Sequence, residues 1–469
     1  TNTVGLVMSE FISKGDWRLA FLYRDYLEQV SVEDVIRVAN YYFKPSNRTV
    51  GIFVPEAGPD RVEVPEMEDI SILLKDFKGK EAVAQGEAFE PTPENIDNRT
   101  LRFEGKNQLE YALLQKETKG DIVILNMVLR LGDEKSLEGK GAIGELTASM
   151  LNKGTANFTR EQLADKFDQL KANVRIGGDG TSVSVSLQTE RSKLAEVIDV
   201  VAEVLKQPSF PEEELKKLKD GIRAQLEEAS ADPMALAQNE FMQVMNTYPK
   251  GHVNYTGTFK EQLEAINAVT LDEVKQFYMD YYGSDAGSLA LVGDFDDAEV
   301  KAAIEKHFAD WKSKSTYKRI EVPFVEPAAM NKNIETPDKA NAMFLAGMRV
   351  RMTNNDPDYA AMVMGNFILG GGFLNSRLAT RIRQQEGLSY GVASFFNAHP
   401  VNEGATFGAY AIYAPENVEK LEKAFREEVE KAIKEGFTAE ELEAARSGWL
   451  QQQQLSRSQD GSLAGTLNG

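Results

Sequence analysis

The stretch that decides the fold is residues 181–189, TSVSVSLQT. Its apolar residues Val183, Val185 and Leu187 alternate with polar residues. Because successive side chains of a strand point to opposite faces, this alternation predicts a strand with one buried face. Residues 121–131, DIVILNMVLRL, are a second and more strongly apolar strand candidate.

The regions around these strands carry amphipathic helical patterns. Their apolar residues recur at the three- and four-residue spacing of helices that bury one side. The predicted helices are 140–151, 160–171, 191–206, 359–369 and 374–385, and further strands are predicted at 341–350, 388–396 and 405–412. We expect an α+β fold of repeated domains, each an antiparallel sheet with helices packed on one face.

Two ordered matches indicate that the chain repeats itself. Residues 30–35, VSVEDV, match 269–274, VTLDEV, and both read as helix starts with a capping sequence. Residues 210–215, FPEEEL, match 437–442, FTAEEL, and both lie between two long amphipathic stretches. Self-similarity of this kind is typical of a chain built from copies of one unit.

The first match continues beyond its helix start. Aromatic pairs follow at 41–42 and 281–282, and β-rich runs follow at 48–54 and 288–292. We expect the aromatic pairs to pack in the core or at its edge rather than to form a ligand site.

The repeats divide the chain into four parts. Residues 1–77 are predicted to be the tail of a preceding domain, and residues 100–317 a complete domain. Residues 318–469 are predicted to be a second copy that stops before its tail. Between the first two parts, residues 78–99 are rich in charge, Ala and Pro, which predicts an extended, solvated linker.

Composition excludes several classes of function. The chain has 53 Lys and Arg against 73 Asp and Glu, a net charge of −20, which argues against a nucleic-acid-binding surface. It has no Cys, hence no thiolate ligands, and no apolar run long enough to span a membrane. Its three histidines, His252, His307 and His399, are too far apart for two of them to share one helix face.

Several motifs together are similar to the pitrilysin/insulinase zinc metallopeptidases, a family that includes fused bacterial members. The similar segments are GAIG at 141–144 with MLNKGT at 150–155, YPKGH at 248–252, the helix and strand of 270–292, GGG at 370–372 with SRL at 376–378, and 383–390. GDWRLAFL at 15–22 is similar to the end of the preceding half in fused members. The order of these pieces implies the non-metal, C-terminal half of such a protein.

In that family the active half carries an inverted His-x-x-Glu-His motif whose histidines bind zinc, while its Glu is the general base. The resemblance places Glu145, Ala148 and Ser149 at these three positions. One possible oxygen ligand remains and the base is an alanine, so this set cannot hold zinc tightly. We expect no cofactor in this chain and zinc in the missing active half.

The following copy keeps another family signature. In active relatives an Arg and a Tyr seven residues later contact the bound peptide and the scissile carbonyl as it becomes an oxyanion. Arg383 and Tyr390 have this spacing, and Gly387 is a plausible residue just after a helix end. Without the resemblance, an Arg and a Tyr at this spacing would be ordinary surface residues.

Gly370, Gly371 and Gly372 are similar to the family's substrate-contacting glycine-rich loop. A tight connection between helices is an equally good explanation of the three glycines, and the spacing of a phosphate-binding loop is absent.

The resemblance implies the non-catalytic, substrate-binding half of a zinc endopeptidase that encloses peptides. Its partners would be a peptide and an active His-x-x-Glu-His half, fused or separate, and this chain alone is expected to be inactive. A closing motion would need a hinge, for which residues 78–98 are the candidate. The alternative is a catalytically silent peptide-binding or scaffold subunit. Many bacterial relatives are exported, which favours the periplasm.

Overall fold

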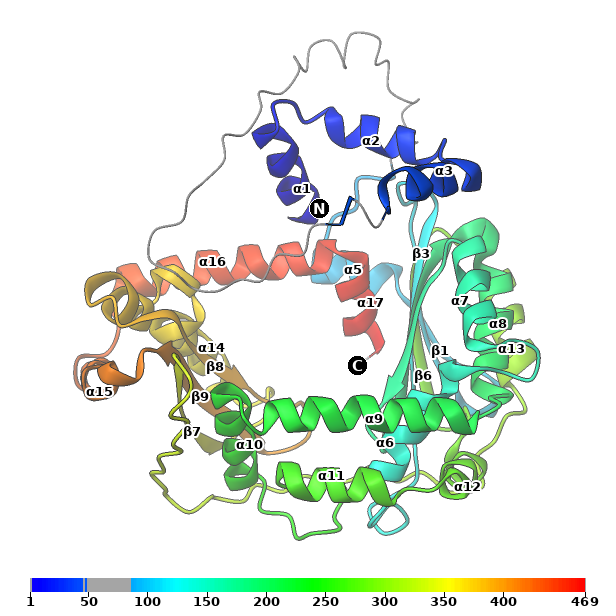
Figure 1. Cartoon of the computed structure of the whole chain (residues 1–469). Helices are drawn as coiled ribbons and strands as arrows, with labels where there is room; N and C mark the ends of the chain where they lie inside the picture. Colours follow the sequence, from blue (N-terminus) through cyan, green and yellow to red (C-terminus); the bar gives the residue numbers. More distant parts are fainter. Residues whose placement is uncertain (1, 45–46, 49–85, 469) are drawn as a thin grey trace. The chain divides into compact units, whose positions relative to one another are not determined.

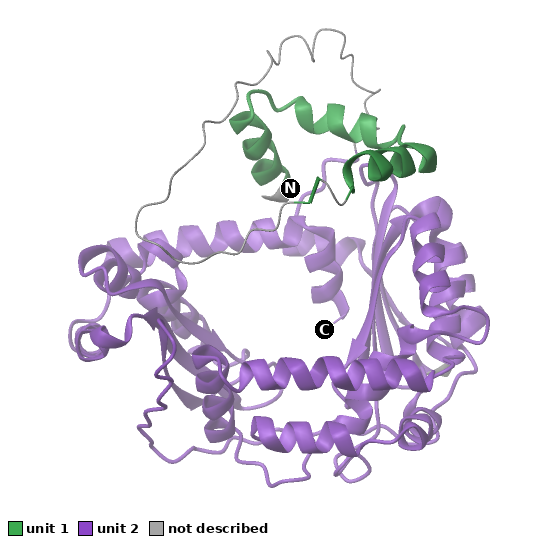
Figure 2. Cartoon of the chain, viewed as in Figure 1, with its two compact units in different colours: residues 1–83 green, residues 84–469 purple. Residues whose placement is uncertain are grey.

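The computed structural model describes residues 2–44, 47–48 and 86–468 (Figure 1). The chain forms two compact units, unit 1 (residues 1–83) and unit 2 (residues 84–469), which Figure 2 colours separately. Most of the strand predicted at 48–54 and the first part of the predicted linker, 78–85, lie outside the described residues.

Unit 1 contains three described helices, α1 (Asn2–Ser13), α2 (Leu19–Leu27) and α3 (Val32–Tyr42). Its buried residues are Leu19 and Leu22 of α2, with Phe11 packed against them. The predicted capping sequence is confirmed, because Ser31 and Asp34 form a reciprocal capping box at the start of α3.

The first part of unit 2 is built on a six-stranded sheet with the order β1-β2-β6-β3-β5-β4. The alternating stretch of the sequence is β5, whose valines and leucine are buried as predicted. All neighbouring pairs are antiparallel except β2 and β6, which are parallel. The strands are β1 (Leu101–Glu104), β2 (Glu110–Gln115), β3 (Ile122–Arg130), β4 (Asn173–Gly178), β5 (Ser182–Glu190) and β6 (Gly287–Gly293).

Helices cover one face of this sheet and form the main core with it, as predicted (Figure 1). Strand β3 contributes Val123, Leu125, Met127 and Leu129 to this core, all almost fully buried. The helices that supply most of the core are α6 (Gly141–Met150), α7 (Arg160–Gln169), α8 (Leu194–Lys206), α12 (Leu271–Tyr281) and α13 (Asp297–Phe308), with α11 (Phe259–Ala268) beside α6.

The opposite face of the sheet is also covered, by two short helices, α5 (Pro93–Arg99) and α17 (Asp460–Asn468) (Figure 1). They share an apolar cluster with the sheet that includes Ile96, Leu463 and Leu467.

The prediction of an extended, solvated linker at 78–99 is therefore wrong for its described part, residues 86–99. Phe89 packs against the same apolar cluster, Arg99 forms an ion pair with Glu87, and residues 93–99 are helical. Charge and Pro gave this stretch the composition of a linker, but its apolar side chains Phe89 and Ile96 pack in the cluster shared with α17.

The second part of unit 2 is a three-stranded antiparallel sheet with the order β7-β9-β8. One face packs on α15 (Val418–Glu435) through Leu421 and Phe425. The strands are β7 (Ala342–Arg351), β8 (Ser389–Asn397) and β9 (Gly404–Tyr413), and α14 (Tyr359–Asn366) runs into the π-helical turn η5 (Phe367–Gly371).

The two parts of unit 2 exchange helices. Helix α9 (Glu212–Ala229) leads to α10 (Pro233–Met245), which packs on β7 of the second sheet. Helix α16 (Ala439–Ser458) leads to α17, which packs on β6 and β3 of the first sheet (Figure 1). The repeat detected at 210–215 and 437–442 begins both helix pairs, so each copy of the unit extends a helix to the other copy's sheet.

Candidate functional site

The degenerate metal positions lie on α6, which packs against the β4–β5 hairpin. Ala148 is fully buried, and a side chain at Gly144 would come within 2.4 Å of the Gly180 backbone. Glu145 and Ser149 are one turn apart, as two ligands of a helix motif would be. Part of Glu145 is exposed, but loss of hydration, followed by the charge of Asp179, raises the pKa of its carboxyl.

These residues do not fit a zinc ion. Zinc sites in proteins use three or four N, S or O ligands, whereas these positions offer one carboxylate and one hydroxyl, and an alanine stands in place of the base. Among residues 2–44, 47–48 and 86–468, no group of three or more His, Asp or Glu side chains is placed to hold a metal ion. The side chains of Glu145, Ala148 and Ser149 therefore supply fewer ligands than a zinc ion needs.

A turn in the second part of unit 2 carries the predicted Arg/Tyr pair. Arg383 lies near the end of the π-helical segment η7 (Ala379–Gln385), and Gly387 follows in the left-handed conformation, with φ +64°. Leu388 N–H then donates to the Ile382 carbonyl at 2.9 Å, which closes the helix end. The expectation that Arg383 ends a helix and Tyr390 begins a strand agrees with this geometry, although the helix is wider than an α-helix.

Tyr390 lies at a β-bulge at the start of β8. Ser389 pairs with Tyr413 and Gly391 with Ile412, so Tyr390 has no partner in the ladder. The Ser389 hydroxyl holds the bulge by accepting from Gly391 N–H at 3.1 Å. Bulges re-aim side chains and are frequent beside active sites; here the tyrosine is 63% exposed.

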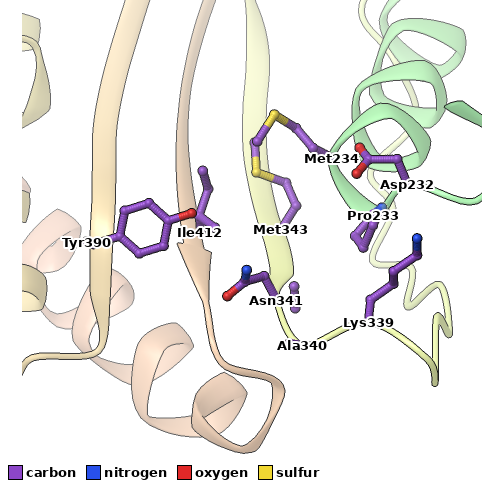
Figure 3. Close-up of a pocket in the computed structure, with 10 residues that line it drawn as sticks. Asp232, Pro233, Met234, Lys339, Ala340, Asn341, Met343, Tyr390 and Ile412 are labelled. Carbon is purple, nitrogen blue, oxygen red and sulfur yellow. The ribbon is translucent and has the colours of Figure 1, made fainter. Parts of the chain in front are cut away.

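The Tyr390 ring lines a hollow of about 200 Å³ between β8, β9, β7 and the start of α10 (Figure 3). Met234, Met343 and Ile412 form an apolar part of its wall. Asp232, which caps α10 by accepting from Ala235 N–H, and Lys339 contribute charged groups of opposite sign. Methionine side chains are flexible and can adapt to contacts of different shape.

Arg383 is exposed near the end of η7, just before β8, the strand that carries Tyr390. Within the part of the chain that the structure describes, its guanidinium has no hydrogen bond or ion pair, whereas the neighbouring Arg381 pairs with Glu386 and Glu427. A guanidinium has five donors, so Arg383 is available to carbonyl oxygens of a ligand.

The three glycines are in close packing. A side chain at Gly370 would come within 2.4 Å of the Ser394 backbone nitrogen, and one at Gly372 within 2.7 Å of the Phe367 carbonyl oxygen. Gly370 is buried and Gly371 is exposed. This geometry agrees with a tight connection between η5 and the next turn; a substrate contact by Gly370, Gly371 and Gly372 stays a prediction.

The residue after the glycines, Phe373, was not anticipated from the sequence. Its φ is +56° and its ring is 74% exposed. A left-handed conformation is strained for an aromatic residue and recurs at binding sites. The carbonyl of Phe373 accepts from both the N–H and the hydroxyl of Ser376, which holds the turn.

Arg377 anchors this glycine-rich turn to the corner between α15 and α16. Its guanidinium donates to both carboxylate oxygens of Glu441, at 2.6 and 2.7 Å, and to the Gly436 carbonyl at 3.0 Å. It also lies over the Phe437 ring. The Arg377 guanidinium lowers the pKa of the Glu441 carboxyl to about 2.

Apart from Tyr390, sequence reasoning missed the residues of the hollow, because Asp232 and Met234 lie in the domain of residues 100–317 and the others in that of residues 318–469. None of the described helices combines the length and the apolar composition needed to cross a bilayer.

Comparisons with known proteins agree with this architecture. Residues 114–254 match the family described as Insulinase (Peptidase family M16), and residues 268–448 match the Peptidase M16 inactive domain. A relative in Bacillus subtilis, the uncharacterized zinc protease YmxG, is 24% identical over 64% of this chain and 71% of its own length.

Solved structures show the same fold. The peptidase M16 inactive domain from Pseudomonas fluorescens superposes with a TM-score of 0.68 at 24% identity, covering 79% of this chain and 86% of the other. The periplasmic protease PqqL from Escherichia coli has a TM-score of 0.63 at 13% identity, covering 93% of this chain but 45% of PqqL. This chain belongs to the pitrilysin/insulinase (M16) peptidase family and corresponds to a non-catalytic half.

Proposed function

We propose that this chain is the substrate-holding half of a zinc endopeptidase, in which Arg383 and Tyr390 contact the peptide while a separate or fused half supplies the zinc. The observation that carries the proposal is the placement of Tyr390. Tyr390 lies at a bulge, three residues after a left-handed glycine, and its ring lines a hollow with both apolar and charged walls.

Both groups suit a peptide carbonyl that gains negative charge. A phenol and a guanidinium donate hydrogen bonds without a metal, and donors placed in advance where charge develops lower a barrier most effectively. A guanidinium stays charged at any pH at which proteins fold. Arg383 is therefore proposed to orient the peptide backbone, and Tyr390 to donate to the scissile carbonyl.

The hollow beside Tyr390 is proposed to receive one apolar side chain of the bound peptide. Met234, Met343 and Ile412 provide adaptable apolar contact, and the exposed ring of Phe373 offers a second apolar contact on the glycine-rich turn. A peptide with an apolar residue next to the cleaved bond is the substrate class that this surface favours.

The partner is proposed to be a half that bears His-x-x-Glu-His. Two observations support it: α6 lacks zinc ligands and a base, and this chain matches about half of PqqL, which is itself a protease. The proposal assigns the zinc and the base to the other half, and zinc in this chain alone is expected below about a tenth of an equivalent after dialysis.

The test is peptide turnover by the assembled enzyme with Arg383→Ala or Tyr390→Phe in this chain. Each is expected to lower turnover at least tenfold, since removal of one oxyanion donor costs about a hundredfold or more in known cases. Tyr410→Phe on β9 and Arg426→Ala on α15 are matched controls that should keep full turnover. Unchanged turnover in both Arg383 and Tyr390 variants, with folding intact, would remove the catalytic contribution and leave a scaffold.

A further inference from the structure

Helix α3 of unit 1 presents an apolar face that the described residues of its unit, 2–44 and 47–48, do not bury. None of the residues of α3 is buried. Exposure is 58% for Val35, 42% for Val38, 60% for Tyr42 and 87% for Phe43, the residue after the helix. Four large apolar residues at helical spacing form a face of the kind that a partner normally covers.

The internal repeat allows the apolar face of α3 to be compared with the buried face of α12. Capping boxes align α3 with α12, because Ser31 and Asp34 correspond to Thr270 and Glu273. The four exposed residues then correspond to buried ones: Val35 to Val274 (0% exposed), Val38 to Phe277 (3%), Tyr42 to Tyr281 (5%) and Phe43 to Tyr282 (3%).

The solvent-facing positions also correspond. Asn40 of α3 aligns with Met279 of α12, which is 49% exposed. The two helices therefore match on their apolar sides and at this one solvent-facing position, whereas the exposed Ile36 and Tyr41 of α3 stand where α12 has Lys275 and Asp280. The prediction that the aromatic pair 281–282 packs in the core is confirmed; Tyr41 and Tyr42 are exposed among the described residues, and for them it stays a prediction.

Helix α12 is held on its own domain by close packing and by hydrogen bonds. Helix α6 lies close to α12 at Gly144, which has no side chain. A Cβ atom at this position would lie 2.9 Å from the Phe277 ring, so the glycine leaves room for that ring. The Tyr281 hydroxyl donates to the Ser136 carbonyl at 2.6 Å and accepts from Lys140 at 2.7 Å. The sheet lies beneath both helices.

We propose that the face of Val35, Val38, Tyr42 and Phe43 docks on the sheet-and-helix body of a further domain of this family, in the place that α12 takes on its own domain. The inference rests on the proposed function for one point, that this further domain belongs to the zinc-bearing half. The face is then the surface through which this chain holds that half. The body is expected to offer a glycine or alanine to Val38 and a polar partner to the Tyr42 hydroxyl.

The first test is a transplant within this chain, with no partner required. Residues 271–282 are replaced by residues 32–43, with or without Val38→Phe to restore the size of the Phe277 ring. At least one of these chains should keep a cooperative thermal transition and slow amide exchange in β3 and β6. The control carries the same insert with Val35→Asn, Val38→Asn and Tyr42→Asn and should lose both. Equal loss in all three chains would overturn the proposed complementarity.

The second test uses the zinc-bearing half, mixed with this chain or fused before it. Amides of α3 should exchange at least tenfold more slowly in the complex than in this chain alone. Val38→Asp should abolish that protection, and Asn40→Asp, which adds the same charge on the other side of the helix, should keep it.

Peptide turnover measured on the same samples separates the two proposals. Turnover without protection of α3 would overturn the docking surface and leave the proposed function intact. Protection of α3 without turnover would support the surface and count against the function. Protection that appears in this chain alone and rises with its concentration would identify a second copy as the occupant and overturn the proposal.

Discussion

The ion pair between Arg377 and Glu441 sets a measurable part of the stability of the second sheet. Glu441→Gln keeps the shape of the side chain and removes its charge. The pKa of the Glu441 carboxyl falls from 4.5 to about 2 on folding, chiefly through the hydrogen bonds from Arg377. A shift of this size corresponds to about 3 kcal/mol, which we discount to about 2 kcal/mol because 30% of the side chain is exposed.

Fluorescence of Trp449 on α16 reports this region once Trp17 and Trp311 are changed to Phe. At a urea dependence of about 2 kcal/mol per molar, Glu441→Gln should lower the unfolding midpoint at pH 7 by roughly 1 M. Glu443→Gln is the matched control, because Glu443 lies on the same helix in an exposed pair with Arg446 and should cost less than about 0.5 kcal/mol.

The pH dependence gives the sharper test. Because the folded pKa is depressed, the stabilisation is complete above the unfolded pKa of 4.5 and is lost as the pH falls through about 2. The difference between the parent and Glu441→Gln should therefore shrink between pH 5 and pH 2. A midpoint at pH 7 equal to that of the parent, or a difference that does not shrink on acidification, would refute the reasoning.

Two further predictions concern packing. Gly370→Ala should destabilise the second sheet by about 1–3 kcal/mol in the same urea assay, since the new methyl would meet the Ser394 backbone at 2.4 Å; Gly221→Ala, with open space around it, should be neutral or stabilising. Leu463→Asp places a charge in the apolar cluster under α17 and should release residues 460–468 to fast amide exchange. The control Ser462→Asp, on the exposed side of the helix, should leave that exchange slow. Protection that survives Leu463→Asp would show that α17 is held by its polar contacts alone.

The regular elements could be predicted because their information is local. Alternation alone fixed β5, and the capping sequences at Ser31 and Thr270 mark helix starts that the structure confirms. These signals depend on residues a few positions apart, so one sequence is enough to read them.

The widened helical turns and the bulge could not be predicted in this way. The bulge at Tyr390 is a property of its register against β9, and the left-handed Phe373 has no signal in its residue type. The glycines at 370–372 do signal a close approach, but the sequence does not say that Ser394 is the neighbour. The pair Arg383 and Tyr390 was found only through family resemblance, since spacing alone does not set it apart from surface residues.

The docking of residues 86–99 changes where a closing motion can occur. The Lys116 ammonium, which is nearly buried, pairs with Asp460 of α17 at 2.6 Å and lies over the Phe89 ring. Arg457 donates to the Pro91 carbonyl at 2.9 Å. Helix α17, at the end of the second copy, and residues 86–99, before the first copy, are thus held on the same face of the first sheet. Residues 86–99 therefore cannot serve as a hinge while α17 is docked.

The exchange of α10 and α17 ties the two sheets of unit 2 to each other. Separation of the two sheets would expose the apolar surfaces under both helices at once. These surfaces are the cluster around Leu463 of α17 and the contact between the Phe241 ring of α10 and Gly347 of β7. Each loss is an apolar burial that a short helix cannot recover in water. If the proposed function holds, a motion that admits a peptide would therefore move unit 2 as one body, and the turn of Arg383 and Tyr390 would move with it.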